Sequence, residues 1–171
     1  DVMIAAGTES MSMVPMMGNK VSMNPAMFQH EENVAIAYGM GMTAEKVAEQ
    51  WKVSRDDQDE FALTSHQRAL KAIENGEFQQ EIAPYTVDEK RPDLINHKVH
   101  EEIAVKNTDV GPRADTRLEA LAKLRPVFAA QGSVTAGNSS QMSDGAGAVV
   151  LMSEAAMQRF NLSPLGRFIG F

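Results

Sequence analysis

A run of small residues, Gly132–Ala148, most constrains the fold, because it leads into the apolar segment Gly145–Met152. Small side chains let another backbone or a slender ligand approach closely, and the serines and the asparagine of the run supply hydrogen-bonding groups. The apolar segment has the continuous hydrophobicity of a buried strand. We therefore predict a tight loop that enters a packed strand, and the residues alone leave open whether the loop lines a ligand site.

Strand-like and helical patterns mix along the chain, which indicates the α/β class. The predicted strands are Asp1–Gly7, Glu81–Val87, Gly145–Met152 and Leu165–Phe171. The predicted helices follow capping residues: Ala44–Trp51 after Thr43, a helix from Ser54 (capped with Asp57) to a stop at Gly76, a helix with a Thr116–Glu119 capping box that ends at Pro126, and Glu154–Phe160 after Ser153. Two stretches are predicted to be loops, the methionine-rich Thr8–Gln29 and the charged residues that follow Val87 up to Pro112.

The overall charge and the lack of cysteine exclude several classes of function. The chain has 171 residues and a formal net charge of −7, which argues against broad nucleic-acid binding, because that needs a basic face. It contains no cysteine, so this segment cannot hold a disulfide, a thiolate metal site or a cysteine nucleophile. No apolar run approaches the roughly 18 residues that suggest a membrane span.

The two ends of the chain are apolar and strand-like, whereas natural termini are usually polar and poorly ordered. We therefore expect the chain to be cut from something longer, and the alternative is a small domain whose terminal strands pair in its own sheet. No signal peptide is visible, but the chain does not begin with Met, so an upstream targeting segment would escape notice.

Serine and histidine residues offer weak candidates for a catalytic or metal site. Ser139 and Ser140 would need an adjacent base, and the surrounding residues do not match the Gly-x-Ser-x-Gly nucleophile motif. The stretches His30–Glu32 and His97–Glu102 lack the spacing of a zinc-binding helix, so we interpret both as solvated surface.

A cluster of basic residues follows the second predicted loop. It consists of Arg113, Arg117, Lys123 and Arg125. Charge runs usually form a solvated face with salt bridges, and the residues alone favour that interpretation over a phosphate-binding patch.

Five motifs, taken in order, resemble the thiolase family. They are Asp1–Ser12, Gly39–Glu45, Ser54–Ala69, Leu118–Phe128 and Gly132–Gly145. The resemblance implies the thiolase fold, a layered α-β-α-β-α body of two similar halves with an inserted loop domain. On that map, residues 1–8 are a strand of the N-terminal half and residues 9–139 are the loop domain, which binds coenzyme A and contributes to oligomerisation. Residues 140–163 are the last strand and helix of the N-terminal half, and residues 164–171 start the C-terminal half.

The resemblance also implies an acyltransferase, an acetyl-CoA C-acyltransferase that cleaves 3-ketoacyl-CoA in fatty-acid β-oxidation or runs the reverse condensation. In the family, one cysteine is acylated, a second cysteine moves a proton and a histidine activates the nucleophile. These residues fall outside this segment, so the segment alone is expected to be inactive. The motif around Asn138–Asp144 is similar to the long-chain 3-ketoacyl-CoA branch.

Coenzyme A and acyl-CoA are the implied substrates, and no permanently bound cofactor or metal is expected. The implied assembly is a homodimer or homotetramer, with a β-oxidation multienzyme as a further partner. The implied location is the bacterial cytoplasm, or the mitochondrion or peroxisome in a eukaryote.

The family's binding residues carry over onto eight positions. Ser140 matches the serine that bonds the pantetheine arm, Ala136 and Gly137 match the tunnel lining, and Met40 matches a residue near the acyl end. The nucleotide-facing positions are Arg113, Ala120, Leu121 and Phe128. The resemblance therefore reverses the interpretation of Arg113, because the phosphates of coenzyme A need cationic partners even on an acidic protein.

Three positions depart from other members of the family. Gly39 stands where biosynthetic members have a histidine, Ala120 replaces a serine of some members, and Gln141 replaces a glycine. These departures alter the contacts expected near the acyl end, the nucleotide and the tunnel.

Two further functions are compatible with the sequence. One is a thiolase-like carrier that binds acyl-CoA or lipid without catalysis, and the other is an oligomerisation module built around the methionine-rich loop. Cysteine motifs in the flanking sequence would establish the enzyme.

Overall fold

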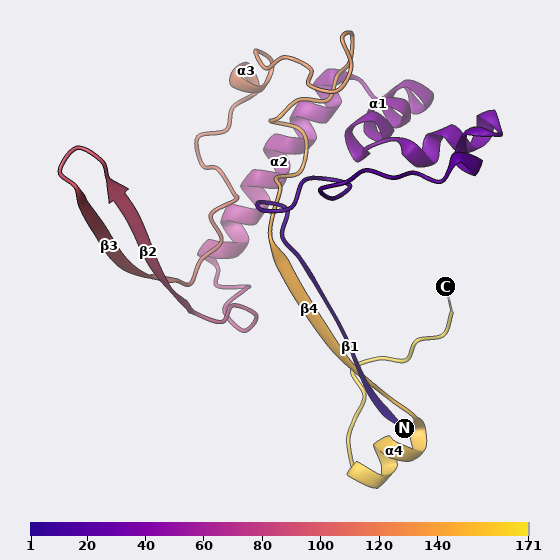
Figure 1. Ribbon diagram of the computed structural model, residues 1–171, viewed down its shortest axis with the longest axis vertical. Coiled ribbons are helices and arrows are strands. Elements are labelled where there is room, and N and C mark those ends of the chain that lie inside the picture. Colours follow the sequence, from indigo (N-terminus) through magenta and orange to yellow (C-terminus); the bar gives the residue numbers. More distant parts are fainter. Residues whose placement is uncertain (171) are drawn as a thin grey trace. The chain divides into compact units, whose positions relative to one another are not determined.

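The computed structural model describes residues 1–170, and the chain divides into two compact units (Figure 1). The first unit combines residues 1–24 with the residues from 142 onward, and the second unit is Pro25–Gln141. The strands and helices mix as the α/β class requires.

The first unit is built on a two-stranded antiparallel sheet of β1 (Val2–Glu9) and β4 (Gly145–Met152). Its register runs from Val2 opposite Met152 to Glu9 opposite Gly145. Helix α4 (Glu154–Phe160) follows β4, and the Ser153 hydroxyl caps it by accepting the backbone N–H of Ala156 at 3.3 Å. The predicted bounds of this strand and helix are confirmed.

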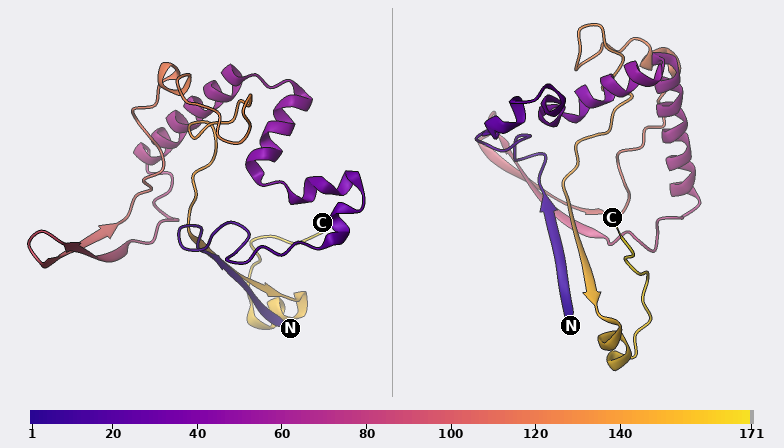
Figure 2. Two further views of the ribbon diagram at one scale, coloured as in Figure 1. Left: turned by 45° about the horizontal axis from the view of Figure 1, so that its top comes forward. Right: turned by 90° about the vertical axis from the view of Figure 1, so that its right-hand side faces the viewer.

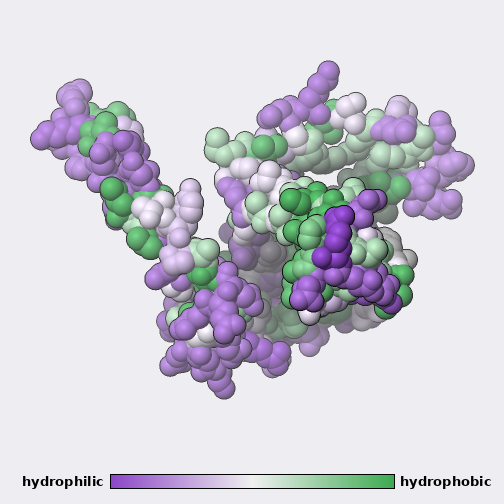
Figure 3. Space-filling model, turned by 90° about the horizontal axis from the view of Figure 1, so that it is seen from below, coloured by the Kyte–Doolittle hydropathy of each residue, from purple (hydrophilic) through white to green (hydrophobic). Residues whose placement is uncertain are grey.

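The β1–β4 sheet is exposed, although its apolar sequence predicts burial. All eight residues of β1 are exposed, and so are all of β4 except Met152, because little of the described chain packs on either face. Hydrophobic residues, coloured green in Figure 3, are visible on the surface in that view. The predicted closing strand does not form over residues 165–170, because no partner there pairs with its backbone, and Phe171 lies outside the described residues.

The second unit contains the longest helices, α1 (Met40–Trp51) and α2 (Arg55–Glu74), which residues 52–54 join (Figure 2). Two 3₁₀ helices precede them, at Pro25–Phe28 and Glu31–Ala37, and the short helix α3 is Leu118–Leu121. The first 3₁₀ helix begins inside the stretch predicted to be a loop. No helix among residues 1–170 is both long and apolar enough to span a bilayer.

Helix α2 begins and ends as its sequence predicts. The Ser54 hydroxyl accepts the backbone N–H of Asp57 at 3.1 Å, and the Asp57 carboxylate accepts the backbone N–H of Ser54 at 3.1 Å. The Ser54 hydroxyl also donates to the Asp57 carboxylate at 2.6 Å, and this bond first, then the bond from the Ser54 backbone N–H, holds the pKa of Asp57 below its ordinary value. At the far end, Gly76 adopts a φ of 71°, the left-handed conformation that suits glycine after a helix.

Two other helix starts differ from the prediction. Helix α1 begins at Met40 with Gly39 as its N-cap, and the hydroxyl of Thr43 donates to the Gly39 carbonyl from within the helix. Helix α3 has Arg117 as its N-cap without a side-chain bond, so the predicted capping box at residues 116–119 does not form. Neither N-cap, Gly39 or Arg117, makes a side-chain capping bond. The presence of a residue that favours capping is therefore not enough to fix the first residue of a helix.

Most of the charged stretch predicted to be a loop is instead a β-hairpin. The first three residues of the hairpin, 85–87, belong to the strand predicted over Glu81–Val87, whereas residues 81–84 are not in a strand. Strand β2 (Tyr85–Asp93) pairs antiparallel with β3 (Lys98–Lys106), and a cross-strand bond joins Lys90 to Glu101 at 2.9 Å. At the turn, the Asp93 carboxylate accepts bonds from Asn96, and these lower the pKa of Asp93 to about 2. The many charges on both faces hide the alternation that would reveal these strands.

Candidate functional site

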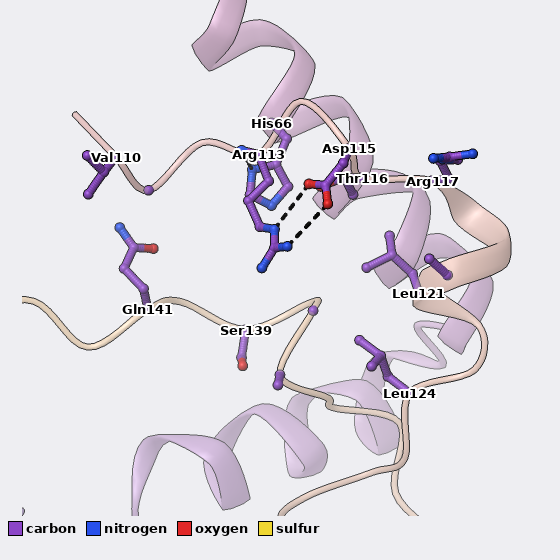
Figure 4. Close-up of a pocket in the computed structure, with 14 residues that line it drawn as sticks. His66, Val110, Arg113, Asp115, Thr116, Arg117, Leu121, Leu124, Ser139 and Gln141 are labelled. Carbon is purple, nitrogen blue, oxygen red and sulfur yellow. Dashed lines mark hydrogen bonds and ion pairs between the residues drawn. The ribbon is translucent and has the colours of Figure 1, made fainter. Parts of the chain in front are cut away.

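The second unit holds a pocket of about 660 Å³ between α2, the loop before α3, α3 itself and the small-residue run (Figure 4). Its lining residues are His66, Val110, Gly111, Arg113, Asp115, Thr116, Arg117, Ala120, Leu121, Leu124, Ala136, Gly137, Ser139 and Gln141. The volume falls within the range of small-molecule and cofactor sites.

Charged groups stand on one side of the pocket. The Arg113 guanidinium donates to both carboxylate oxygens of Asp115, at 3.3 Å each, and both side chains are exposed. This hydrogen bonding, more than the charge attraction, raises the pKa of Arg113 and lowers the pKa of Asp115, which Arg117 also lowers. Two guanidinium groups and one carboxylate therefore line the pocket, and the local charge balance is cationic although the chain is acidic.

His66 joins the charged side of the pocket from α2. The backbone N–H of Arg113 donates to its Nδ1 at 3.2 Å. In the neutral ring the proton therefore sits on Nε2, which leaves a second nitrogen able to donate. His66 thus fixes the loop that carries Arg113 against α2.

Small residues form the opposite wall. A Cβ on Gly137 would lie 2.5 Å from Leu121 Cδ2 and 2.5 Å from Leu124 Cδ1, so only glycine allows this approach. The Ser139 hydroxyl donates to the Thr135 carbonyl at 2.7 Å, and Thr135 is fully buried. The Ser139 hydroxyl thus stabilises the loop by bonding to its backbone.

A buried carboxylate on α1 anchors the start of this wall. Glu45, 9% exposed, accepts the backbone N–H of Ser133 at 2.9 Å and that of Val134 at 2.9 Å. A Cβ on Gly132 would lie 2.1 Å from the Glu45 carboxylate, so glycine is required here too. Helix α1 therefore fixes where the small-residue run enters the pocket.

The pocket brings together five of the eight predicted binding residues. They are Arg113, Ala120, Leu121, Ala136 and Gly137. Ser140 does not line it: its side chain is exposed and its hydroxyl donates to the Gln141 carbonyl at 3.2 Å. Met40 is exposed at the start of α1, and the ring of Phe128 packs over neighbouring Gly41.

Sequence reasoning missed Glu45 and His66, and also Asp59 of α2, whose carboxylate accepts from Asn138 Nδ2 at 2.9 Å. Asp59 and His66 are seven residues apart on α2, so they share one helix face. That spacing was the available signal. No spacing pattern marked Glu45, because its hydrogen-bond partners lie 88 and 89 residues away in the chain.

Residues 1–170 contain no group of three or more potential ligands that could hold a metal ion. His97 and His100 both lie on exposed parts of the hairpin, and His100 Nε2 is 3.1 Å from the Asp93 carboxylate.

Known proteins match this chain over almost its whole length. The profile of the family described as "Thiolase, N-terminal domain" matches residues 1–155. A 3-ketoacyl-CoA thiolase of Bacillus subtilis (strain 168) is 46% identical over 173 residues, which cover 100% of this chain and 43% of that protein.

Solved structures give the same result. The dimeric peroxisomal thiolase of Saccharomyces cerevisiae has a TM-score of 0.69 and 36% identity, over 98% of this chain and 40% of that one. Human mitochondrial 3-ketoacyl-CoA thiolase has a TM-score of 0.68 and 36% identity, over 96% and 42%. The chain thus spans less than half the length of these relatives, and the predicted α/β thiolase fold is confirmed.

Proposed function

Because this chain belongs to the thiolase family, we propose that its pocket binds coenzyme A within a larger acetyl-CoA C-acyltransferase. That enzyme would cleave 3-ketoacyl-CoA to acyl-CoA and acetyl-CoA in fatty-acid β-oxidation, or run the reverse condensation. One observation carries the proposal: a cationic side and a wall of small residues face each other across one pocket of about 660 Å³.

The cationic side suits the phosphates of coenzyme A. Guanidinium groups form charge-assisted, bidentate bonds to phosphate, and Arg113 already makes two such bonds to the Asp115 carboxylate. A phosphate would compete with Asp115 for Arg113, while Arg117 adds further positive charge. Ala120 and Leu121 supply apolar surface beside these charges, suited to an adenine ring.

The small-residue wall suits the slim pantetheine arm. Ala136 and Gly137 present little more than backbone to the pocket, so an extended chain can lie close to them. We propose that Ser140 donates a hydrogen bond to this arm in place of its bond to the Gln141 carbonyl. Met40 and Phe128, which lie outside the pocket, are proposed to lie near the acyl end and the nucleotide.

The chemical step needs groups that this chain does not have. It has no cysteine, so the thiol that accepts the acyl group must come from elsewhere in the protein. The chain's own part is to bind and orient the coenzyme, which is why we propose that it is inactive alone.

Assembly and location are part of the proposal. The yeast relative is dimeric, which supports a homodimer or a homotetramer, and a β-oxidation multienzyme is proposed as a further partner. The relatives come from bacteria, peroxisomes and mitochondria. We propose the bacterial cytoplasm, with the other two compartments as the alternatives in a eukaryote.

Titration calorimetry on the full-length protein that contains this chain tests the proposal. Arg113→Ala should weaken coenzyme A binding by less as salt is added, because salt screens phosphate contacts. Ser140→Ala should weaken it by about 0.5–1.5 kcal/mol, the net contribution of one hydrogen bond. Arg91→Ala on the hairpin is the control and should leave affinity unchanged.

Failure of the unmodified protein to bind coenzyme A would reject the proposal. Binding without cleavage of 3-ketoacyl-CoA would instead support the non-catalytic acyl-CoA or lipid carrier. A salt-independent effect of Arg113→Ala would remove the ionic role of that residue.

A further inference from the structure

Arg55 and Asp59 lie one turn apart on α2, on the face that carries His66 to the pocket. Arg55 Nε donates to Asp59 Oδ2 at 2.8 Å. Asp59 is only 3% exposed, yet neither residue lines the pocket. A buried charge is destabilising unless it is paired and fully hydrogen-bonded. The remaining hydrogen bonds of Arg55 and Asp59 show which segments the pair connects.

Arg55 holds the wall that contains α3. Its Nη2 donates to the Leu121 carbonyl at 2.6 Å and to the Leu124 carbonyl at 3.2 Å. These carbonyls lie at the end of a four-residue helix and of the turn after it. The Leu121 carbonyl also accepts the backbone N–H of Leu124 at 2.9 Å. Leu121 and Leu124 both line the pocket.

Asp59 holds the opposite, small-residue wall. Its Oδ1 accepts from Asn138 Nδ2 at 2.9 Å. Asn138 in turn accepts the backbone N–H of Thr135 at 2.7 Å and donates to the Ser133 carbonyl at 3.1 Å. Its chain neighbours Gly137 and Ser139 both line the pocket.

The two walls are in close contact at Gly137, where there is no room for a side chain. A single added carbon at Gly137 would lie 2.5 Å from Leu121 and Leu124. A shift of a few tenths of an ångström between the walls therefore changes the shape of the pocket. Among residues 1–170, no buried polar side-chain atom lacks a partner, so the network that sets this spacing is complete.

We infer that the Arg55–Asp59 pair is a positioning device that fixes the separation of the two pocket walls and thereby sets the affinity for coenzyme A. The coenzyme part of this inference rests on the proposed function. The positioning part rests only on the bonds from one helix to both walls. Arg55 and Asp59 touch no ligand in this scheme and act through Leu121, Leu124 and Asn138.

Two substitutions in the full-length protein test the device. Asp59→Asn keeps the shape of the side chain but removes the negative charge that pairs with Arg55. Arg55→Lys keeps the positive charge, but a lysine ammonium cannot bond to Asp59 and to the two carbonyls at the same time. Matched controls on the same helix are Glu60→Gln and Arg68→Lys, because both side chains are exposed and neither takes part in the network.

The measurements are the dissociation constant for coenzyme A by calorimetry, and kcat and KM in a thiolysis assay. Each test variant should raise the dissociation constant and the KM for coenzyme A about tenfold, as expected for a hydrogen bond to a charged group, with little change in kcat. A merely structural role would reduce the active fraction, so apparent kcat would fall while KM stayed constant. That pattern, or variants indistinguishable from the controls, would overturn the inference.

Hydrogen exchange followed by mass spectrometry separates this inference from the proposed function. Asp59→Asn should speed exchange in residues 133–139, and Arg55→Lys should speed it in residues 117–124, whether or not a ligand binds. If the unmodified protein binds no coenzyme A, the proposed function fails while exchange still tests the device. Unchanged exchange in both segments rejects the device even if the protein binds coenzyme A.

Discussion

The small-residue wall and the β2–β3 hairpin both depend on carboxylates, but in opposite environments. At the wall, the buried Glu45 accepts two backbone N–H groups that lie 88 and 89 residues away. At the hairpin turn, the Asp93 carboxylate accepts bonds from residues two and three positions further on, where water competes. The comparison teaches that distant partners and burial make the wall a tertiary feature, whereas the hairpin turn is a local one. Substitutions at the wall should therefore lower the free energy of unfolding much more than substitutions at the hairpin turn.

Gly132→Ala should have the largest effect. The added Cβ would overlap the Glu45 carboxylate, which must leave Ser133 N and Val134 N, so a buried charge loses its donors. We expect the free energy of unfolding to fall by about 3 kcal/mol, from urea denaturation of the full-length protein. Gly111→Ala is the matched control, because its Cβ would meet only the flexible end of Gln141 at 3.3 Å. Equal effects at the two glycines would break the comparison.

Glu45→Gln should have an intermediate effect. The amide group places an N–H₂ donor against one of the two backbone donors, so one of those bonds is lost without any change in size. We expect a loss of about 1–2 kcal/mol in the same urea experiment. Glu49→Gln, one turn along the same face of α1, changes only an exposed pair with Lys46 and should leave the midpoint unchanged. A stable Glu45→Gln protein would show that the carboxylate does not anchor the wall.

Asn96→Ala should have the smallest effect, confined to the hairpin. Bonds from Asn96 are the main reason why the pKa of Asp93 is lowered from 3.8 to about 2. Because the pKa of Asp93 is lower in the folded state than in the unfolded state, ionised Asp93 stabilises the turn above about pH 4. This stabilisation is lost as the pH falls toward 2. NMR titration should show the Asp93 midpoint rising toward 3.8 in the variant, while the amide signals of residues 133–139 stay unchanged. An unmoved midpoint would assign the shift to another group.

The sequence predicted those parts of the fold whose determinants are close together in the chain. The Ser54–Asp57 box and the Ser153 cap each involve residues three apart, and both are confirmed. Thr43 failed as an N-cap because α1 extends back to Met40. Most of the hairpin, from residue 88 onward, was missed because charged residues such as Lys90 and Glu101 occupy strand positions where apolar side chains usually give the signal.

The candidate site was predictable only in part. Arg113 and Ala136 were expected to share a site through resemblance to the family, and one pocket contains them both. The contacts that fix its walls could not be predicted, because the partners of Glu45 and Asp59 are brought to them only by tertiary folding. Spacing could place Asp59 on the helix face of His66, but it could not identify Asn138 as the partner of Asp59. Whether the exposed Ser140 contacts a coenzyme stays a prediction.

The close approach of Gly132 to Glu45 has a consequence for engineering the pocket. If residues 132–139 were randomised and selected for binding of a new ligand, position 132 should return glycine whatever the ligand. The group that excludes a side chain there is Glu45, which does not line the pocket. Diversity should instead accumulate at Ala136, which lines the pocket. Mutational tolerance along this short run would then separate positions that build the wall from positions that face its contents.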